Sequence, residues 1–203
     1  MDKIEICNMA LARIGVEAIE TLTEASEPAR VCRQFYDHAR RIVLRRFPWV
    51  FATRRAKLAL LPVKPENFLY AYRYPAQCAC LRKLYNENYD NIPAYTMYQV
   101  LSDREGLVIY TNEENVSAEY TADVQDCNLF DEHFADVLGW RLAAEIAFKL
   151  TGNIQITQMA EQQYGNLYLE AAANSENEQN MKDADPYTFV SARFGSGGGN
   201  EPW

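Results

Sequence analysis

The side chains that could support nucleophilic catalysis are few in this chain, and their spacing is unfavourable. There are two histidines, His38 and His133, and the second follows Cys127 by six residues at the start of a predicted helix. A cysteine nucleophile needs a histidine base and a third group that orients the base, and this spacing indicates neither contact. No GxSxG motif occurs, and the glycine-rich run at 195–199 lacks the Lys-Ser/Thr and helix of a phosphate-binding loop. The sequence therefore indicates no nucleophilic or phosphate-transfer site.

The other cysteines and the carboxylates give no defined metal or acid–base site. Five cysteines are scattered along the chain, with Cys78 and Cys80 as the one close pair and no CxxC motif. An odd, scattered set favours free thiols in a reducing compartment, and a metal site would need clustered ligands. The adjacent acids at 113–114 and 131–132 are typical of turns and helix starts, although a glycosidase-type pair facing across a cleft stays open. We predict no enzymatic activity, no cofactor and no metal.

The charge distribution is more informative than these candidate groups. The 203 residues carry a formal charge of −8, yet the segment 30–57 holds nine basic side chains and one acid. That segment is therefore +8 and the rest of the chain is −16. Such a polarised chain favours steering onto an oppositely charged partner or onto another copy of itself. We predict a charged interface on the exposed side of one helix, formed by Arg30, Arg33, Arg41 and Arg45.

Four segments have the apolar spacing of helices, and capping residues mark one end of each of the first two. The first is expected over about 2–14 with Gly15 after its end, and the second over 26–46 with Ser26 as N-cap. Helical spacing returns from about 129 to 150, and again from 154 to about 173. A single polar line in the third helix is formed by Arg141, Glu145 and Lys149 at i, i+4 spacing, and the order of Glu145 before Lys149 favours an ion pair between these two.

The middle of the chain has the alternation and aromatic content of β-strands. Strands are expected at 50–60, 68–74, 95–101, 107–111 and 116–122, and one short helix is expected near 78–85. The predicted fold class is α+β: a four-helix bundle from residues 1–48 and 127–173, with a β-rich insert, a small sheet or barrel-like subdomain, at 49–126.

The composition changes again at residue 174. Residues 174–203 have low apolar content and a Gly/Ser run, so they are predicted to form an extended, flexible C-terminal arm. The arm nevertheless keeps four aromatic residues, which suggests that it orders on a partner: Tyr187, Phe189, Phe194 and Trp203. No stretch of the chain approaches the roughly 18 consecutive apolar residues of a membrane helix, so we expect no membrane partner.

Several short motifs, taken in order, resemble one known family. They begin with Asn8-Met-Ala-Leu-Ala-Arg-Ile-Gly15 and continue with Trp49-Val-Phe51, Leu60-Leu-Pro62, Tyr72-Arg-Tyr-Pro75 and Cys80-Leu-Arg82. They end with a helix around Phe134 that contains AAEIAFKLTG. This set, which covers roughly residues 4–170, resembles the tail tubular protein A family, the head-to-tail adaptors of short-tailed bacteriophages.

The resemblance implies a structural role at the head–tail junction of a virion assembled in the bacterial host. It implies a ring, expected to hold twelve copies, that joins the portal protein to the tail nozzle protein. Double-stranded DNA would pass through the channel without sequence-specific binding. The resemblance supplies no catalytic residue, and it assigns the arm and its four aromatics to the portal.

Two other classes of function stay open from the residues alone. The first is a tail-associated cell-wall hydrolase, which would need a carboxylate pair facing across a cleft. The second is a DNA-binding protein that uses the arginine-rich helix, although a pI near 4.9 and the lack of a helix-turn-helix signature argue against it.

Overall fold

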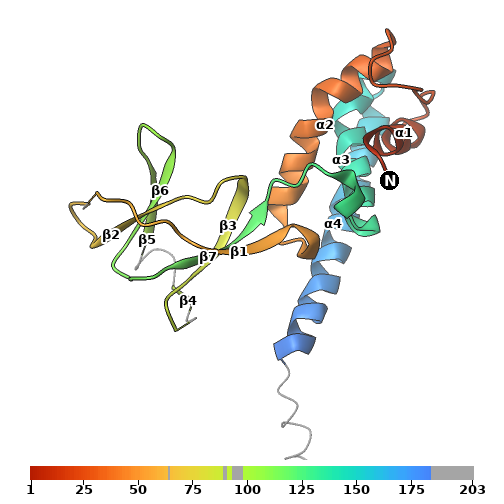
Figure 1. Ribbon diagram of the computed structural model, residues 1–203. Coiled ribbons are helices and arrows are strands. Elements are labelled where there is room, and N and C mark those ends of the chain that lie inside the picture. The colour runs from red at the N-terminus through yellow and green to blue at the C-terminus, as the bar shows by residue number, and fades with distance from the viewer. Residues whose placement is uncertain (64, 89–90, 93–97, 184–203) are drawn as a thin grey trace, which may run out of the picture. The chain divides into compact units, whose positions relative to one another are not determined.

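Within its described residues, the chain has an α+β fold with four α-helices and two antiparallel sheets (Figure 1). These elements lie within the residues that the computed structural model describes, namely 1–63, 65–88, 91–92 and 98–183. Contacts divide the chain into two compact units, Met1–Tyr164 and Gly165–Trp203. All side-chain contacts described below belong to the first unit.

The first two helices begin and end where their capping residues predict. Helix α1 spans Lys3–Arg13, with Asp2 and Glu5 forming a capping box, and Gly15 follows at a φ of +74°. Helix α2 spans Glu27–Arg46, and the hydroxyl of its N-cap Ser26 accepts a hydrogen bond from the amide of Ala29. Phe47 leaves α2 in extended geometry because it precedes a proline. Both predicted helices are confirmed.

The last two helices are separated by a sharp left-handed break. Helix α3 spans Glu132–Thr151, starts at the N-cap Asp131 and ends at Gly152, whose φ is +64°. Helix α4 spans Ile154–Asp183. The predicted end of this helix near residue 173 was wrong, because residues 174–183 contain no glycine or proline and include several strong helix formers.

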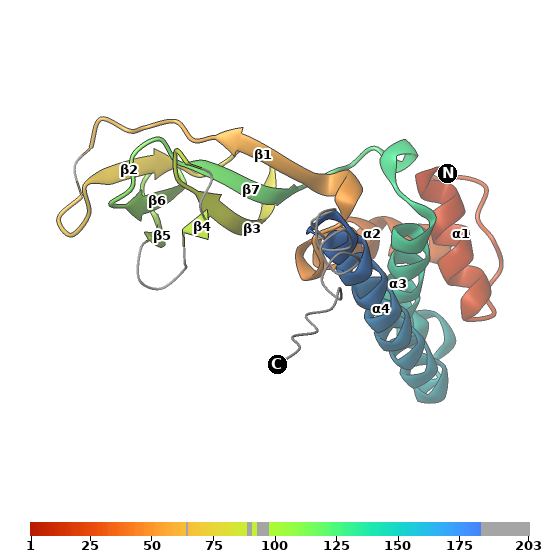
Figure 2. The same cartoon turned by 90° about the horizontal axis from the view of Figure 1, so that it is seen from below.

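Helix α3 packs against both α1 and α2, which lie beside it in the two ribbon views (Figure 2). Its apolar residues are buried on more than one face, so it forms the centre of this group. Gly139 leaves room for the side chain of Arg13 from α1, because a Cβ there would lie 2.6 Å from a guanidinium nitrogen of that arginine. That guanidinium pairs with Asp136 and stacks over Trp140, 4.4 Å from the ring centroid. The predicted packing of all four helices into one bundle stays a prediction.

The β-strands form one sheet of four strands and one of three. The first has the order β1-β7-β3-β4, comprising Thr53–Lys57, Ser117–Ala122, Cys78–Tyr85 and Asn91–Ile92. The second has the order β2-β6-β5, comprising Tyr70–Arg73, Leu107–Thr111 and Tyr98–Ser102. Every pairing is antiparallel.

Both sheets contribute to one apolar core. Leu84 and Ala118 come from the four-stranded sheet, and Tyr72 and Ile109 come from the three-stranded sheet. All four are almost fully buried. The two sheets therefore stabilise each other through a shared interior, and the predicted β-rich region is present.

One prediction in this region was wrong and another was right only in part, and each outcome has a physical reason. The segment 78–85, expected to be a short helix, is β3, the longest of the described strands. Its pairing with β7 shifts register twice, between Cys78 and Cys80 and between Leu81 and Lys83, so the alternation that identifies a strand is lost. The expected strand at 50–60 begins as a 3-10 turn, Val50–Ala52, because Trp49 and Phe51 pack edge-on against Phe134 of α3.

A buried guanidinium joins α2 to the segment that leaves β7. The side chain of Arg40 is 3% exposed, and its Nη1 donates to the Asp123 carboxylate at 2.5 Å and to the Val124 carbonyl at 2.6 Å. A second arginine, Arg82 of β3, donates to the carbonyls of Leu44 and Arg45 at the end of α2. These contacts bridge α2 and the four-stranded sheet.

We predict that Arg40→Met strongly destabilises the protein. The substitution removes one partner of a mostly buried ion pair and leaves the Val124 carbonyl without its donor, so unfolding should become easier by about 3–5 kcal/mol. Urea denaturation followed by circular dichroism measures this change. Arg30→Met in the same helix is the control, because that exposed side chain pairs with the neighbouring Glu27. Equal midpoints for the two variants would contradict the proposed anchoring role.

Candidate interaction surface

The four arginines predicted to form a charged interface fall into two pairs with different surroundings. Arg30 and Arg33 lie near the start of α2 and are held locally. The guanidinium of Arg30 pairs with Glu27, and Arg33 donates to the Leu22 carbonyl at 2.5 Å. The charge of Arg30 is therefore neutralised by a carboxylate one turn earlier in the helix. The guanidinium of Arg33 contacts the loop before the helix.

Arg41 and Arg45 lie one turn apart toward the end of α2 and contact backbone carbonyls. Arg41 donates to Asp37 of its own helix at 3.2 Å, and Arg45 donates to Ala79 of β3 at 3.0 Å. Among the described residues, no carboxylate oxygen lies within 4.0 Å of either guanidinium. Their positive charges are therefore not neutralised by an ion pair in that part of the chain.

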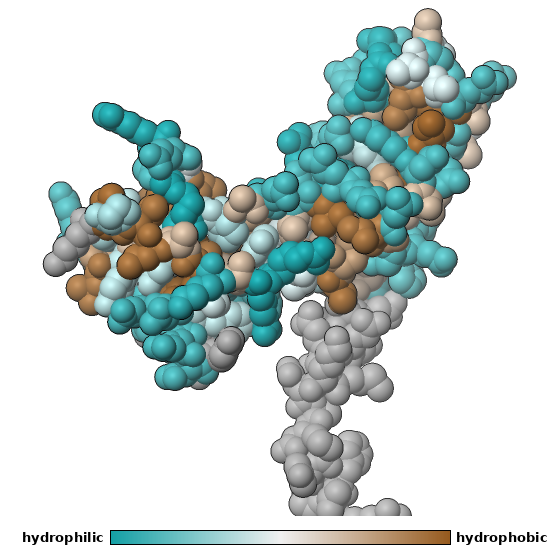
Figure 3. Space-filling view, viewed as in Figure 1, coloured by the Kyte–Doolittle hydropathy of each residue, from teal (hydrophilic) through white to brown (hydrophobic). Residues whose placement is uncertain are grey.

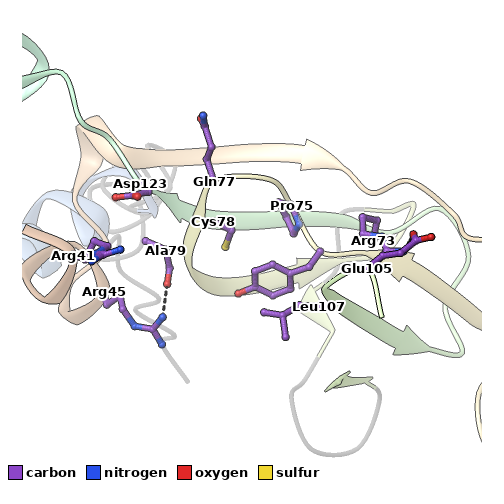
Figure 4. A pocket seen from close by; sticks show the side chains of 11 residues that line it. Arg41, Arg45, Arg73, Pro75, Gln77, Cys78, Ala79, Glu105, Leu107 and Asp123 are labelled. Carbon is purple, nitrogen blue, oxygen red and sulfur yellow. Dashed lines mark hydrogen bonds and ion pairs between the residues drawn. The ribbon is translucent and has the colours of Figure 1, made fainter. Parts of the chain in front are cut away.

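These two arginines line a cleft of about 400 Å³ between α2 and the strands (Figure 4). Gln77, Cys78 and Ala79 also line this cleft, and Arg45 contacts the Ala79 carbonyl directly. Gln77 has a φ of +55°, a left-handed backbone conformation that forms the turn before β3.

The acidic residues of the cleft already have partners. Asp123 pairs with Arg40, and Glu105 pairs with Arg73 at 2.7 Å. Arg73 also contacts Asp103 and holds the pKa of that carboxyl below its ordinary value through a hydrogen bond. The unpaired charges that face the cleft are therefore positive, so the cleft suits a carboxylate- or phosphate-bearing segment better than a cation.

The remaining polar side chains of the cleft are uncharged at neutral pH. Burial raises the pKa of the Cys78 thiol, and burial together with a hydrogen bond to this thiol raises the pKa of Tyr74. The Tyr74 hydroxyl also accepts a hydrogen bond from the Leu81 amide at 3.2 Å. A thiol with a raised pKa is a poor nucleophile, which argues against thiol catalysis here.

The structure does not bring the histidines and Cys127 together in one site. His38 Nε2 lies 3.7 Å from Glu145 Oε1, whereas the Cys127 sulfur contacts the Tyr36 hydroxyl at 3.3 Å. The structure does not pair Cys127 with His133. In the described part of the chain, no group of three or more His, Cys, Asp or Glu side chains is placed to hold a metal ion.

The structure also corrects the predicted ion pair between Glu145 and Lys149. Glu145 pairs with Arg141 one turn earlier at 2.5 Å, while Lys149 reaches Gln34 of α2 at 3.4 Å. The ring of Tyr164 also covers the Arg141 guanidinium, 5.5 Å from the ring centroid. The predicted arm residues, Tyr187, Phe189, Phe194 and Trp203, lie outside the described residues.

Sequence reasoning missed two arginines that join α2 to the strands and the segment after them, Arg40 and Arg82. For Arg40 a signal was present, since it follows the buried Tyr36 by four residues and precedes the buried Val43 by three. An arginine on the apolar face of a helix is expected to have a buried partner. For Arg82 the sequence carries no comparable signal.

Comparisons with known proteins give no independent support for a family. Neither a search of protein-family models nor a search of curated proteins returned a match for this chain. Among the described residues, no helix is both long enough and apolar enough to cross a membrane.

We predict that Cys78 reacts slowly with iodoacetamide. Because burial raises its pKa, the thiolate fraction at pH 8 is lower than for a free cysteine, and the rate should keep rising above pH 9. The measurement is peptide mass spectrometry on a Cys80→Ser variant, across a series of pH values. A pH profile that matches free cysteine would contradict the burial of this thiol.

Proposed function

We propose that this chain is a head-to-tail adaptor that assembles as a ring between the portal and the tail of a short-tailed bacteriophage. The resemblance of its ordered motifs to the tail tubular protein A family supports this role. The structural observation that carries the proposal is the pair Arg41 and Arg45, which face a cleft without a carboxylate partner on a chain of net charge −8. Unpaired guanidinium groups beside a cleft suit a charged contact with a partner.

Ring closure requires two different complementary patches on each copy, and a polarised charge distribution fits this requirement. The basic side of α2 would face acidic residues of a neighbouring copy or of the portal. The ring holds twelve copies, continues the channel through which double-stranded DNA passes, and presents a surface to the tail nozzle. Each contact is modest, so the protein is largely monomeric in dilute solution and closes into a ring when portal is present.

The finer architecture belongs to the same proposal. The four helices form the bundle that supports the β-rich insert, and the C-terminal arm extends from the bundle to the portal. Its aromatic residues, Tyr187, Phe189, Phe194 and Trp203, make the portal contact. The protein carries out no chemistry; it acts through assembly at the head–tail junction.

We predict that Arg41→Glu combined with Arg45→Glu weakens assembly without unfolding the protein. The reversed charges would repel an acidic partner surface, so the affinity for portal should fall about 100-fold at low salt. The measurement is mass photometry of the full chain with and without the portal protein of the same virus. The matched control, Arg54→Glu with Lys57→Glu, changes the net charge equally at two exposed positions that do not line the cleft. Normal ring formation by the double α2 variant would overturn this role of the arginines.

We also predict that removal of residues 184–203 prevents attachment to portal-bearing heads. The truncated chain keeps every contact described for α1–α3 and the sheets, so its circular dichroism and melting temperature should match those of the full chain. Cosedimentation with portal-bearing heads measures attachment. A chain that ends at Asp183 and still cosediments at wild-type levels would remove the arm from the proposed function.

A further inference from the structure

Two buried cysteines meet where α1 crosses α2. Cys7 and Cys32 are both 0% exposed, and a hydrogen bond joins their thiols. A second contact fixes the same crossing, since the Lys3 ammonium lies 3.4 Å from the Asp37 carboxylate and 4.4 Å from the centroid of the Tyr36 ring. Lys3 lies one turn before Cys7 in α1, and Tyr36 lies one turn after Cys32 in α2. The two contacts therefore share one line between helices that run in opposite directions, and helix packing holds the two sulfur atoms together.

The hydrogen bond between the two thiols makes them unequal as acids. It lowers the pKa of Cys32 below its ordinary value, although burial acts in the opposite direction. The same hydrogen bond raises the pKa of Cys7, and burial raises it further. Cys7 is therefore the donor, and the sulfur of Cys32 is the acceptor that is better able to lose its proton. A thiolate beside a second thiol is the arrangement that thiol–disulfide exchange requires.

A third thiol lies on a neighbouring element and has partners of its own. The Cys127 sulfur contacts the Tyr36 hydroxyl at 3.3 Å and the Gln125 carbonyl at 3.8 Å. Cys127 belongs to the 3-10 turn Cys127–Leu129, before α3. Cys7 and Cys32 are therefore the pair that the fold places for mutual reaction, and Cys127 is the competitor that an experiment must distinguish.

The pair is shielded from reagents while the chain is folded. Mainly hydrophilic residues cover α2 in the space-filling view (Figure 3), and neither thiol reaches the surface. The Asn8 side chain, next to Cys7, exchanges two hydrogen bonds with the backbone of Ile19 at 3.0 and 2.9 Å, which ties α1 to the connection that follows it. A reagent therefore reaches the sulfur atoms when α1 opens locally, so the folded chain reacts slowly.

We propose that Cys7 and Cys32 form a disulfide that fastens α1 to α2 once the chain leaves a reducing compartment. The bond closes a loop over residues 8–31, which restricts the unfolded chain and so stabilises the folded one. Glutathione keeps thiols reduced in the cytoplasm, whereas disulfides persist outside the cell. The timing of the reaction rests on the proposed function, because a virion protein is made in the cytoplasm and later leaves it with the particle. The pairing itself depends on the fold alone.

The reaction is a thiol–disulfide exchange with a small disulfide such as oxidised glutathione. The Cys32 thiolate attacks one sulfur of that disulfide, which forms a mixed disulfide and releases one glutathione. Cys7 then loses its proton and attacks the Cys32 sulfur, which forms the bond between the helices and releases the second glutathione. The two cysteines are oxidised, the glutathione disulfide is reduced, and the two thiol protons end on the two released glutathione molecules.

The pairing is tested by refolding the full chain from urea in glutathione buffers of graded composition, so that access to the thiols does not limit the result. Peptide mass spectrometry after acid quenching maps the bonds. We expect a link between Cys7 and Cys32 whose effective concentration, [GSH]²/[GSSG] at half oxidation, is about 100-fold higher in the folded chain than in urea. Equal values in the two states, or a link from Cys7 to Cys127 in its place, would overturn the proposal.

The stabilising effect is measured as a change in melting temperature. The oxidised chain should melt about 6–12 °C above the reduced chain, and dithiothreitol should remove this difference. Cys32→Ala should melt at the same temperature with and without oxidised glutathione. Cys127→Ala is the matched control and should keep the full difference. A difference that persists in Cys32→Ala, or none in the wild-type chain, would contradict the role of this pair.

The timing is tested by comparing the chain inside infected cells with the chain in purified particles. Acid quenching followed by alkylation with iodoacetamide in denaturant preserves the state of each thiol for mass spectrometry. We expect free Cys7 and Cys32 in the cells and a bond between them in the particles. Particles that contain the chain with both thiols free would refute the inference and leave the adaptor function standing, whereas a cross-linked chain that never joins a particle would do the reverse.

Discussion

The ion pair of Arg40 fixes how α2 lies against the strands, and the candidate surface depends on that placement. A guanidinium that is removed from water must be paired, and Asp123 and the Val124 carbonyl provide its partners directly after β7. Arg82 then holds the last carbonyls of the same helix from β3. With α2 held at its middle and at its end, Arg41 and Arg45 line a defined cleft together with Gln77, Cys78 and Ala79. The position of the surface charges is thus a consequence of one buried charge.

The sequence predicted the elements whose determinants are local. Ser26 and Gly152 limit their helices through hydrogen bonds and backbone angles that depend on adjacent residues, so the helix limits they mark were recognised. Strand β3 was missed because its two register shifts arise from its pairing with β7, some forty residues away in the chain. The interruption in its alternation is visible in the sequence, but the reason for it is not.

The candidate surface was predictable in type but not in detail. The excess of arginine in α2 indicated a charged face, yet the adjacent residues Arg40 and Arg41 lie in different surroundings. One is buried against Asp123 and the other faces the cleft. Which arginine is neutralised depends on partners that the fold brings from more than eighty residues away, and composition cannot supply them. The same limit applies to Glu145, which pairs with Arg141, while Lys149 reaches Gln34 of α2.

The pairing of Thr53 with Thr121 has a consequence for how such a chain can evolve. The chain enters the β-rich region at β1 and leaves it at β7, and these two points are direct neighbours in one ladder. A region whose entry and exit lie together can be replaced by another of different length without moving the ends of the flanking helices. Recombination between related genomes could therefore exchange residues 53–122 as a cassette. The incoming segment would need to supply a counterpart of Arg82, and the following residue Asp123 would stay with the helices.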